Sequence, residues 1–201
     1  PYDVSGVAHI LASIFRDTGD GLSGLGSSQQ AVTLIRLEGI GASVPHRAGS
    51  VSSALASFGT AEMIADEASA ALWAAIRDVT PFAASGPLGA WPVWRIVCPP
   101  ASGGAFGQAL ARDTGGDVIY DWGGGLIWAA LPPAPDAHAT LLRQRLKPIG
   151  GHATLLRGTD QVRAAIDVFH PQEAGVAALG QRVKASFDPK HILNRGRMVR
   201  T

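Results

Sequence analysis

Strand-like and helix-like segments alternate in two successive blocks, and this order restricts the possible folds more than any other feature of the chain. In the first block, residues 1–14 and 31–38 have the apolar and polar pattern expected of strands. Two helical patterns follow, beginning at Ser43 and Thr60, each with a hydroxyl group suited to capping and a regularly spaced apolar face. The first block is therefore predicted to hold two strands and two helices.

The second block also begins with a strand, and it contains two predicted helices. Its predicted elements are a strand over 93–98, a helix over 104–113, a hairpin over 118–122 and 126–131, a helix over 136–147 and a strand over 151–156. A last helix is predicted over residues 173–187, with Val176, Leu179, Val183 and Phe187 on one face. Residues 16–30 and 81–92 are rich in glycine, serine or proline and are predicted to be loops.

This order of elements predicts the α+β class, with an antiparallel sheet that carries helices on one face and leaves the other face free. In the strand over residues 31–38, Arg36 and Glu38 fall on the same side as Val32. An apolar row that ends in charged residues suits a strand lying near a polar site. We therefore expect the free face of the sheet to carry the functional site.

The composition describes a folded protein and excludes several kinds of chemistry. Hydrophobic residues make up 46% of the 201 residues and charged residues only 16%, which is typical of a chain that buries a core. The net charge of +1 gives no electrostatic basis for binding nucleic acid. The single cysteine, Cys98, excludes an intrachain disulfide and a cysteine-ligated iron–sulfur or zinc site, and we expect it to be buried on a strand. The histidines are scattered, so no metal site is predicted.

Several short motifs occur in order along the chain. They are residues 3–6 (DVSG), 36–39 (RLEG), 43–47 (SVPHR), 93–100 (VWRIVCPP), 121–124 (DWGG), 150–158 (GGHATLLRG), 169–171 (FHP) and 187–198 (FDPKHILNRGRM). With these motifs the chain resembles FAD-linked oxidases of the vanillyl-alcohol-oxidase type, and in particular the C-terminal part of the E-type, FAD-binding component of glycolate oxidase. It departs from that pattern at Arg195, where the family has proline, so the tail is expected to be less rigid or to make a different ligand contact.

The resemblance implies a cap or substrate domain with a ferredoxin-like sheet whose free face lies over a flavin ring. It implies FAD as the cofactor and a reaction in which a 2-hydroxy acid such as glycolate gives a hydride to the flavin and becomes a 2-oxo acid. It also implies partner subunits that carry the electrons away, namely a second flavin subunit and an iron–sulfur subunit. The implied location is cytoplasmic, or at the periphery of the inner membrane through this complex.

The part of the family that binds FAD has no counterpart among these motifs. A flavin needs a pyrophosphate cradle of glycines and backbone amides, which the family holds in an N-terminal domain, and the glycines at 123–125 lack dinucleotide-binding spacing. Because the chain starts at Pro1 without methionine, we expect a fragment whose upstream FAD-binding domain is missing. Residues 1–201 are then a single cap-like domain with a helix and tail over 173–201, and the isolated chain is expected to be inactive and to retain no FAD tightly.

Three residues are candidates for contact with substrate. His152 follows two glycines, where it can act as a base, an acid or a donor to a flavin oxygen, or else only bond to a neighbouring carbonyl. Arg36 and Arg95 are cations within apolar strands, and a guanidinium is the natural bidentate partner of a 2-hydroxy acid carboxylate. The alternative for either arginine is a solvated side chain or, for Arg36, an ion pair with Glu38.

Three further residues complete the predicted site. Asp121 stands beside an aromatic residue at a strand end, where it can orient a ligand or a base, or simply cap the turn before the glycines. The resemblance places Asn194 near the flavin, and Arg197 is predicted to meet a phosphate or an acidic group. The alternative for both is a solvated tail.

A binding or assembly module is the competing hypothesis, because a ferredoxin-like plait often serves as a docking surface. In this case the exposed apolar face of the sheet would contact partner subunits, or would pair two copies of the fragment into a homodimer.

Overall fold

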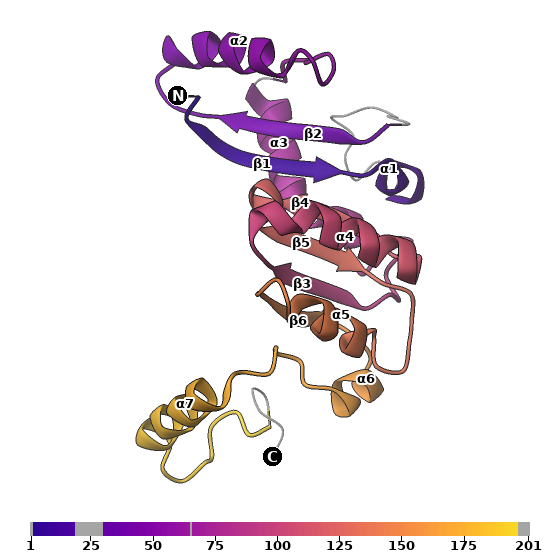
Figure 1. Ribbon diagram of the computed structural model, residues 1–201, viewed down its shortest axis with the longest axis vertical. Helices are drawn as coiled ribbons and strands as arrows, with labels where there is room; N and C mark the ends of the chain where they lie inside the picture. The colour runs from indigo at the N-terminus through magenta and orange to yellow at the C-terminus, as the bar shows by residue number, and fades with distance from the viewer. Residues whose placement is uncertain (1, 19–29, 65, 197–201) are drawn as a thin grey trace.

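The computed structural model of the chain describes residues 2–18, 30–64 and 66–196. In this part, six strands form one sheet in the order β2-β1-β4-β5-β3-β6 (Figure 1). The strands are β1 (Val4–Ile10), β2 (Val32–Leu37), β3 (Val93–Val97), β4 (Asp117–Asp121), β5 (Leu126–Ala130) and β6 (His152–Arg157). The helices are α1 (Ala12–Thr18), α2 (Ser43–Leu55), α3 (Asp66–Arg77), α4 (Pro100–Thr114), α5 (Ala139–Leu146), α6 (Asp160–Ala165) and α7 (Ala174–Phe187), with short 3-10 turns η2 (Thr80–Phe82) and η3 (Trp122–Gly124).

The second block of the sequence forms a complete ferredoxin-like unit. Its elements follow one another as β3, α4, β4, β5, α5 and β6, and its strands lie in the order β4-β5-β3-β6. Every neighbouring pair in this unit is antiparallel, which is the arrangement of a split βαβ plait. The predicted α+β class, with a ferredoxin-like antiparallel sheet, is therefore confirmed.

The first block extends this sheet instead of forming a second plait. Strand β1 pairs with β2 along its length and joins the plait through His9 opposite Tyr120 and Ile10 opposite Ile119. Two boundaries differ from the sequence prediction. Residues 12–18 form α1, although strand was expected as far as residue 14, and the helix expected from Thr60 begins only at Asp66. The predicted loop over residues 16–30 lies mostly outside the described residues.

Two clusters of buried residues lie on opposite faces of the sheet. Helices α4 and α5 pack on one face, where Phe106, Leu110 and Leu142 cover the plait strands. Helix α3 packs on the other face at the β1–β2 end, where it contributes Leu72 and Ile76. In Figure 1, α4 and α5 accordingly lie in front of the sheet and α3 lies behind it. The second face, which the sequence analysis expected to be free, is thus covered in part by α3, by Ile14 of α1 and by Phe82 of η2. The part of this face that stays uncovered belongs to the plait.

Glycines allow α4 to approach the sheet closely. A Cβ added at Gly103 would lie 1.9 Å from the backbone oxygen of Gly124, and one added at Gly107 would lie 2.5 Å from the Tyr120 hydroxyl. Real Cβ atoms do not approach other atoms so closely, so both positions need glycine. The helix begins with a proline in its first turn and ends at Gly115, whose φ is 71°. This packing fixes the η3 turn against the start of α4.

Helix α7 lies away from the sheet at one end of the molecule (Figure 1). The helix has no buried residue, and the face formed by Val176, Leu179, Val183 and Phe187 is exposed to solvent. The predicted helix and its apolar face are confirmed, but the described part of the chain offers that face no core. An apolar face without a covering element is typical of a contact surface.

Candidate functional site

The free part of the second face centres on Arg95 in the middle of β3. In the strand register, Arg95 lies opposite Trp128 of β5 and opposite Thr154 of β6, so these three side chains share one row and one face. His152 lies opposite Val97, two positions further along on the same face. The sheet therefore brings Arg95 and His152, two of the predicted site residues, to neighbouring positions.

The Arg95 guanidinium lies against two indole rings. Its central carbon is 5.2 Å from the ring centre of Trp122 and 5.9 Å from that of Trp128, which are cation–π distances. Arg95 is half-buried, and none of the described residues accepts a hydrogen bond from it or forms an ion pair with it. We call Arg95, Trp122 and Trp128 the Arg–Trp cluster. The in-plane N–H donors of the Arg95 guanidinium are therefore not used by any described residue.

Trp122 is placed over Arg95 by an unusual turn. Its φ is 52°, in the left-handed region that large side chains rarely adopt, and 57% of its surface is exposed. Asp121 holds this turn, because its Oδ1 accepts a hydrogen bond from the Trp122 backbone N–H at 2.7 Å. The structure thus gives Asp121 the turn-capping role named as its alternative, and a ligand-orienting role for this carboxylate stays a prediction.

His152 lies in a shallow groove at the edge of the same face. The groove has a volume of about 410 Å³ and is lined by His152, Thr154, residues 169–173 and Val176. His170 of the FHP motif lies near His152, and its pKa is lowered by burial and by the nearby charges of Arg143 and His152. The His152 side chain is exposed, so its imidazole is accessible to a ligand. The described structure shows no hydrogen bond to a neighbouring carbonyl for it.

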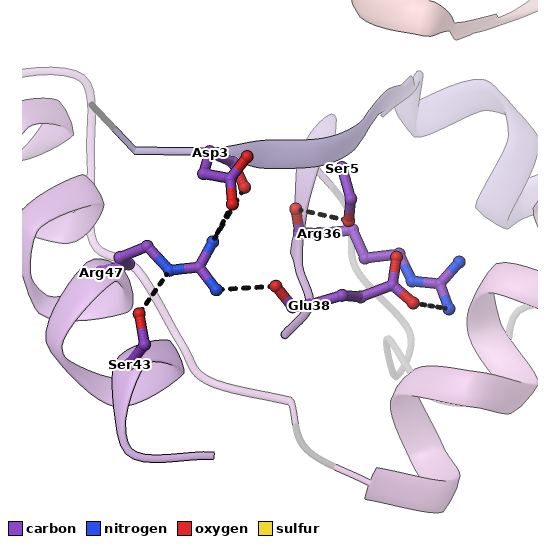
Figure 2. A network of polar contacts seen from close by, with 6 residues as sticks. All are labelled: Asp3, Ser5, Arg36, Glu38, Ser43 and Arg47. Carbon is purple, nitrogen blue, oxygen red and sulfur yellow. Dashed lines mark hydrogen bonds and ion pairs between the residues drawn. The ribbon is translucent and has the colours of Figure 1, made fainter. Parts of the chain in front are cut away.

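Arg36 is far from this cluster and already has partners. Its Nη2 is 2.9 Å from Oε1 of Glu38 (Figure 2). Its guanidinium also lies over the ring of Trp73 from α3. The row of Arg95 continues across the sheet to Val32, four residues before Arg36 on β2. Four strand spacings and four residues correspond to about 20 Å or more. Arg36 therefore has the ion pair named as its alternative, and it does not share a site with Arg95.

The motif over residues 43–47 has a structural role. Arg47 of α2 donates to the Asp3 carbonyl at 3.0 Å, to the Glu38 carbonyl at 2.7 Å and to the Ser43 hydroxyl at 3.1 Å (Figure 2). It also pairs with the Asp3 carboxylate at 3.2 Å, and its side chain is only 12% exposed. Figure 2 shows the guanidinium between α2 and the ends of β1 and β2. Arg47 thus fastens α2 to the edge of the sheet.

The tail after α7 is organised by Asp188, which the sequence analysis did not select. The buried Asp188 carboxylate accepts hydrogen bonds from the N–H groups of Ile192 and Leu193, both at 3.0 Å, and pairs with Lys184. The Lys184 hydrogen bond, with these N–H groups, lowers the pKa of Asp188 to about 2. Asn194 follows with a φ of 48° and an exposed side chain. Arg197 lies outside the described residues, so its predicted contact stays a prediction.

The other expectations from the sequence concern Cys98, metal ions and membrane-spanning helices. Cys98 is buried, as expected, and burial raises the pKa of its thiol. Among the described residues, no group of three or more histidine, cysteine or acidic side chains is arranged to hold a metal ion. None of the helices described here is long and apolar enough to cross a bilayer.

Sequence reasoning missed the roles of Trp122 and Trp128, although the strand alternation could have placed Trp128 beside Arg95.

Comparison with known proteins identifies the family. The family of FAD linked oxidases, C-terminal domain, matches residues 7–105 and 170–198, which together are more than half of the chain. The match includes Arg36, Arg95 and Asn194, whereas Asp121, Trp122 and His152 lie between its two parts. No match was found among curated proteins. The chain belongs to the family of FAD-linked oxidase C-terminal domains.

Proposed function

We propose that this chain is the substrate-side portion of a flavin-dependent oxidoreductase that acts on 2-hydroxy acids, with glycolate as the smallest example. The free part of the sheet would cover the flavin, and Arg95 would bind the carboxylate of the substrate. The observation that supports this proposal is the half-buried Arg95, which faces the open side of the sheet without a carboxylate partner among the described residues.

The chemistry of the neighbouring side chains fits this assignment. A guanidinium presents parallel N–H donors to both oxygens of a carboxylate, which fixes the orientation of the acid. Thr154 lies opposite Arg95 and His152 lies two residues before Thr154 on β6, so a hydroxyl and an imidazole are available near the C2 oxygen of a short acid. His152 is then the candidate group that accepts the hydroxyl proton while the hydride leaves to the flavin.

The FAD would be held mainly outside the residues described here. FAD supplies the hydride acceptor, and its pyrophosphate requires a cradle of backbone amides. Within this chain, the exposed Asn194 at a left-handed position is the group proposed to contact the flavin, because Asp188 fixes the backbone just before it. Arg197 is proposed to contact a phosphate or an acidic group. Electron transfer to a second flavin subunit and an iron–sulfur subunit belongs to the same proposal.

The test uses this chain joined in one polypeptide to an FAD-binding domain of the same family. Arg95→Met is compared with Arg36→Met, which removes an ion-paired arginine from the same face of the sheet. We expect kcat/KM for glycolate or another 2-hydroxy acid to fall by about 100-fold or more in Arg95→Met, because a charge-assisted bidentate contact is lost. The Arg36→Met protein should keep its turnover, and both should keep their FAD content. Equal turnover of the two variants would refute the assignment of Arg95.

A second candidate function is an assembly module, and the exposed apolar face of α7 favours it. Val176, Leu179 and Val183 are each about half exposed, and Phe187 is 84% exposed. Replacing Leu179 and Val183 by Ser would leave the residues that line the His152 groove unchanged. Loss of association with the other subunits, at normal turnover of a 2-hydroxy acid with an artificial acceptor, would favour the assembly role. Loss of turnover in Arg95→Met favours the catalytic one.

A further inference from the structure

The backbone at Trp122 places a large ring against Arg95. Among the described residues, Arg95 is the only cation in the middle of the free sheet face of the plait. The residue has a φ of 52°, and the next two residues, Gly123 and Gly124, have φ values of 61° and 97°. Such a conformation costs free energy for a residue with a Cβ, and it persists only where the surroundings enforce it. Here the Asp121 cap and the close packing of Gly124 against α4 enforce it.

The result is an exposed indole that does not serve the core. Trp122 is 57% exposed, whereas Trp94 of the same unit is fully buried and donates its indole N–H to the Ala137 carbonyl at 2.8 Å. Its ring lies against the Arg95 guanidinium, 5.2 Å from the central carbon. An indole in this position limits the movement of the guanidinium, whose N–H donors all lie in its own plane and stay available at its edges.

A guanidinium with an occupied face and open edges favours a flat anion. A carboxylate reaches the edge and accepts two parallel hydrogen bonds within the guanidinium plane. A tetrahedral anion such as sulfate can also accept two, but its out-of-plane oxygens would point towards the electron-rich faces of the indole rings. Lysine would keep the charge at this position but not the fork. Trp128, at 5.9 Å, adds a second ring beside the same cation. The cluster therefore has the features of a site for planar carboxylates.

We propose that the Arg–Trp cluster binds a planar carboxylate edge-on through Arg95, and that Trp122 is the positioning residue that holds the guanidinium for it. This inference rests on the proposed function, since it places the carboxylate of the substrate on Arg95. It goes further by assigning the ligand geometry and a residue outside the range matched by the family.

The test is isothermal titration calorimetry of the chain with oxalate, a small planar carboxylate, and with sulfate as the tetrahedral anion of equal charge. We expect saturable binding of oxalate and about tenfold weaker binding of sulfate, whose out-of-plane oxygens would face the indole rings. Arg95→Met should abolish oxalate binding. Arg95→Lys should weaken it about tenfold or more, because a charged fork contributes more than a point charge.

Variants of Trp122 separate positioning from a merely structural role. Trp122→Ala should weaken oxalate binding by about tenfold, and Trp122→Phe, which keeps an aromatic face, should restore most of it. Trp73→Phe, near the distant Arg36, is the control and should bind oxalate normally. Circular dichroism monitors folding, and if Trp122→Ala fails to fold, Trp122→Leu takes its place.

Several outcomes would overturn the inference. These are equal affinity for sulfate and oxalate, unchanged oxalate binding in Arg95→Met, or a Trp122→Phe variant as weak as Trp122→Ala. Failure of the proposed function gives a different result. If oxalate binds as expected but Arg95→Met in the flavin-containing polypeptide turns over 2-hydroxy acids normally, the carboxylate site exists and the assigned reaction is wrong.

Discussion

Arg157, at the end of β6, offers the most demanding test of how this fold is held together. Its Nε donates to the Trp91 carbonyl at 2.8 Å, its Nη1 to the Phe82 carbonyl at 2.5 Å and its Nη2 to the Leu88 carbonyl at 2.7 Å. Phe82 and Leu88 belong to the core beside α3. One guanidinium thus fastens the loop before β3 to the far edge of the sheet, and we predict that Arg157→Met destabilises the protein substantially.

The size of the effect follows from these three bonds. A hydrogen bond to a charged group contributes about 1.5–3 kcal/mol, so three independent bonds would give about 4.5 kcal/mol or more. Water can reach part of a loop at the surface, and the Met side chain refills the space of the arginine stem. We therefore expect a loss of about 3 kcal/mol, which for a domain of this size lowers Tm by about 6–12 °C. Arg157→Lys should lose most of this as well, because one ammonium cannot replace the fork.

The assay is chemical and thermal unfolding followed by circular dichroism. Arg112→Met is the matched control, because Arg112 is 73% exposed and, among the residues that the structure describes, pairs only with the adjacent Asp113. An exposed pair of this kind contributes little, so the control should stay within about 0.5 kcal/mol of the parent chain. A free energy of unfolding for Arg157→Met within about 1 kcal/mol of the parent would show that these bonds do not hold the loop.

Three further predictions concern packing and protonation. Gly103→Ala should cost about 3 kcal/mol in urea unfolding, because its Cβ would lie 1.9 Å from the Gly124 oxygen, whereas Gly104→Ala, with open space, should stabilise α4 by about 0.5–1 kcal/mol. Asp188 has a pKa of about 2, so its stabilisation of the tail should be present above about pH 4 and lost as the pH falls towards 2, seen as faster amide exchange after α7. Burial raises the pKa of Tyr120 to about 12, so stability should fall between about pH 10 and 12, when ultraviolet absorbance reports phenolate.

The elements of the plait could be predicted because local patterns determined them. The strands at β3, β4, β5 and β6 and their helices lie within a few residues of the predicted ranges, since their apolar periodicity agrees with their burial. The position of α3 on the second face could not be predicted. It depends on how a hairpin pairs with β4 through only two residue pairs, and no local pattern encodes that choice.

The candidate site was predictable in part for a related reason. Arg95 attracts notice as a charge in an apolar strand, and the alternation of β6 puts His152 on its face. Arg36 satisfies the same sequence criterion, yet it pairs with Glu38, because the two side chains leave the same face of one strand end. The position of Trp122 depends on a left-handed turn that the run of glycines only suggests. Sequence criteria therefore find cations on strands, and only the structure tells which of them lacks a partner.

Some residues of this site lie within the range matched by the family and others lie outside it. Arg95 lies within the matched residues, whereas Trp122, Trp128, Thr154 and His152 all lie between residues 105 and 170, outside the match. A property that all members need, such as covering a flavin, should be built mainly from matched residues. Under the proposed function, the choice of acid should depend on the unmatched residues that surround Arg95. We therefore expect exchange of the η3 turn between family members to change the preferred acid while the flavin stays bound, and an exchange that releases flavin without changing the preferred acid would contradict this division.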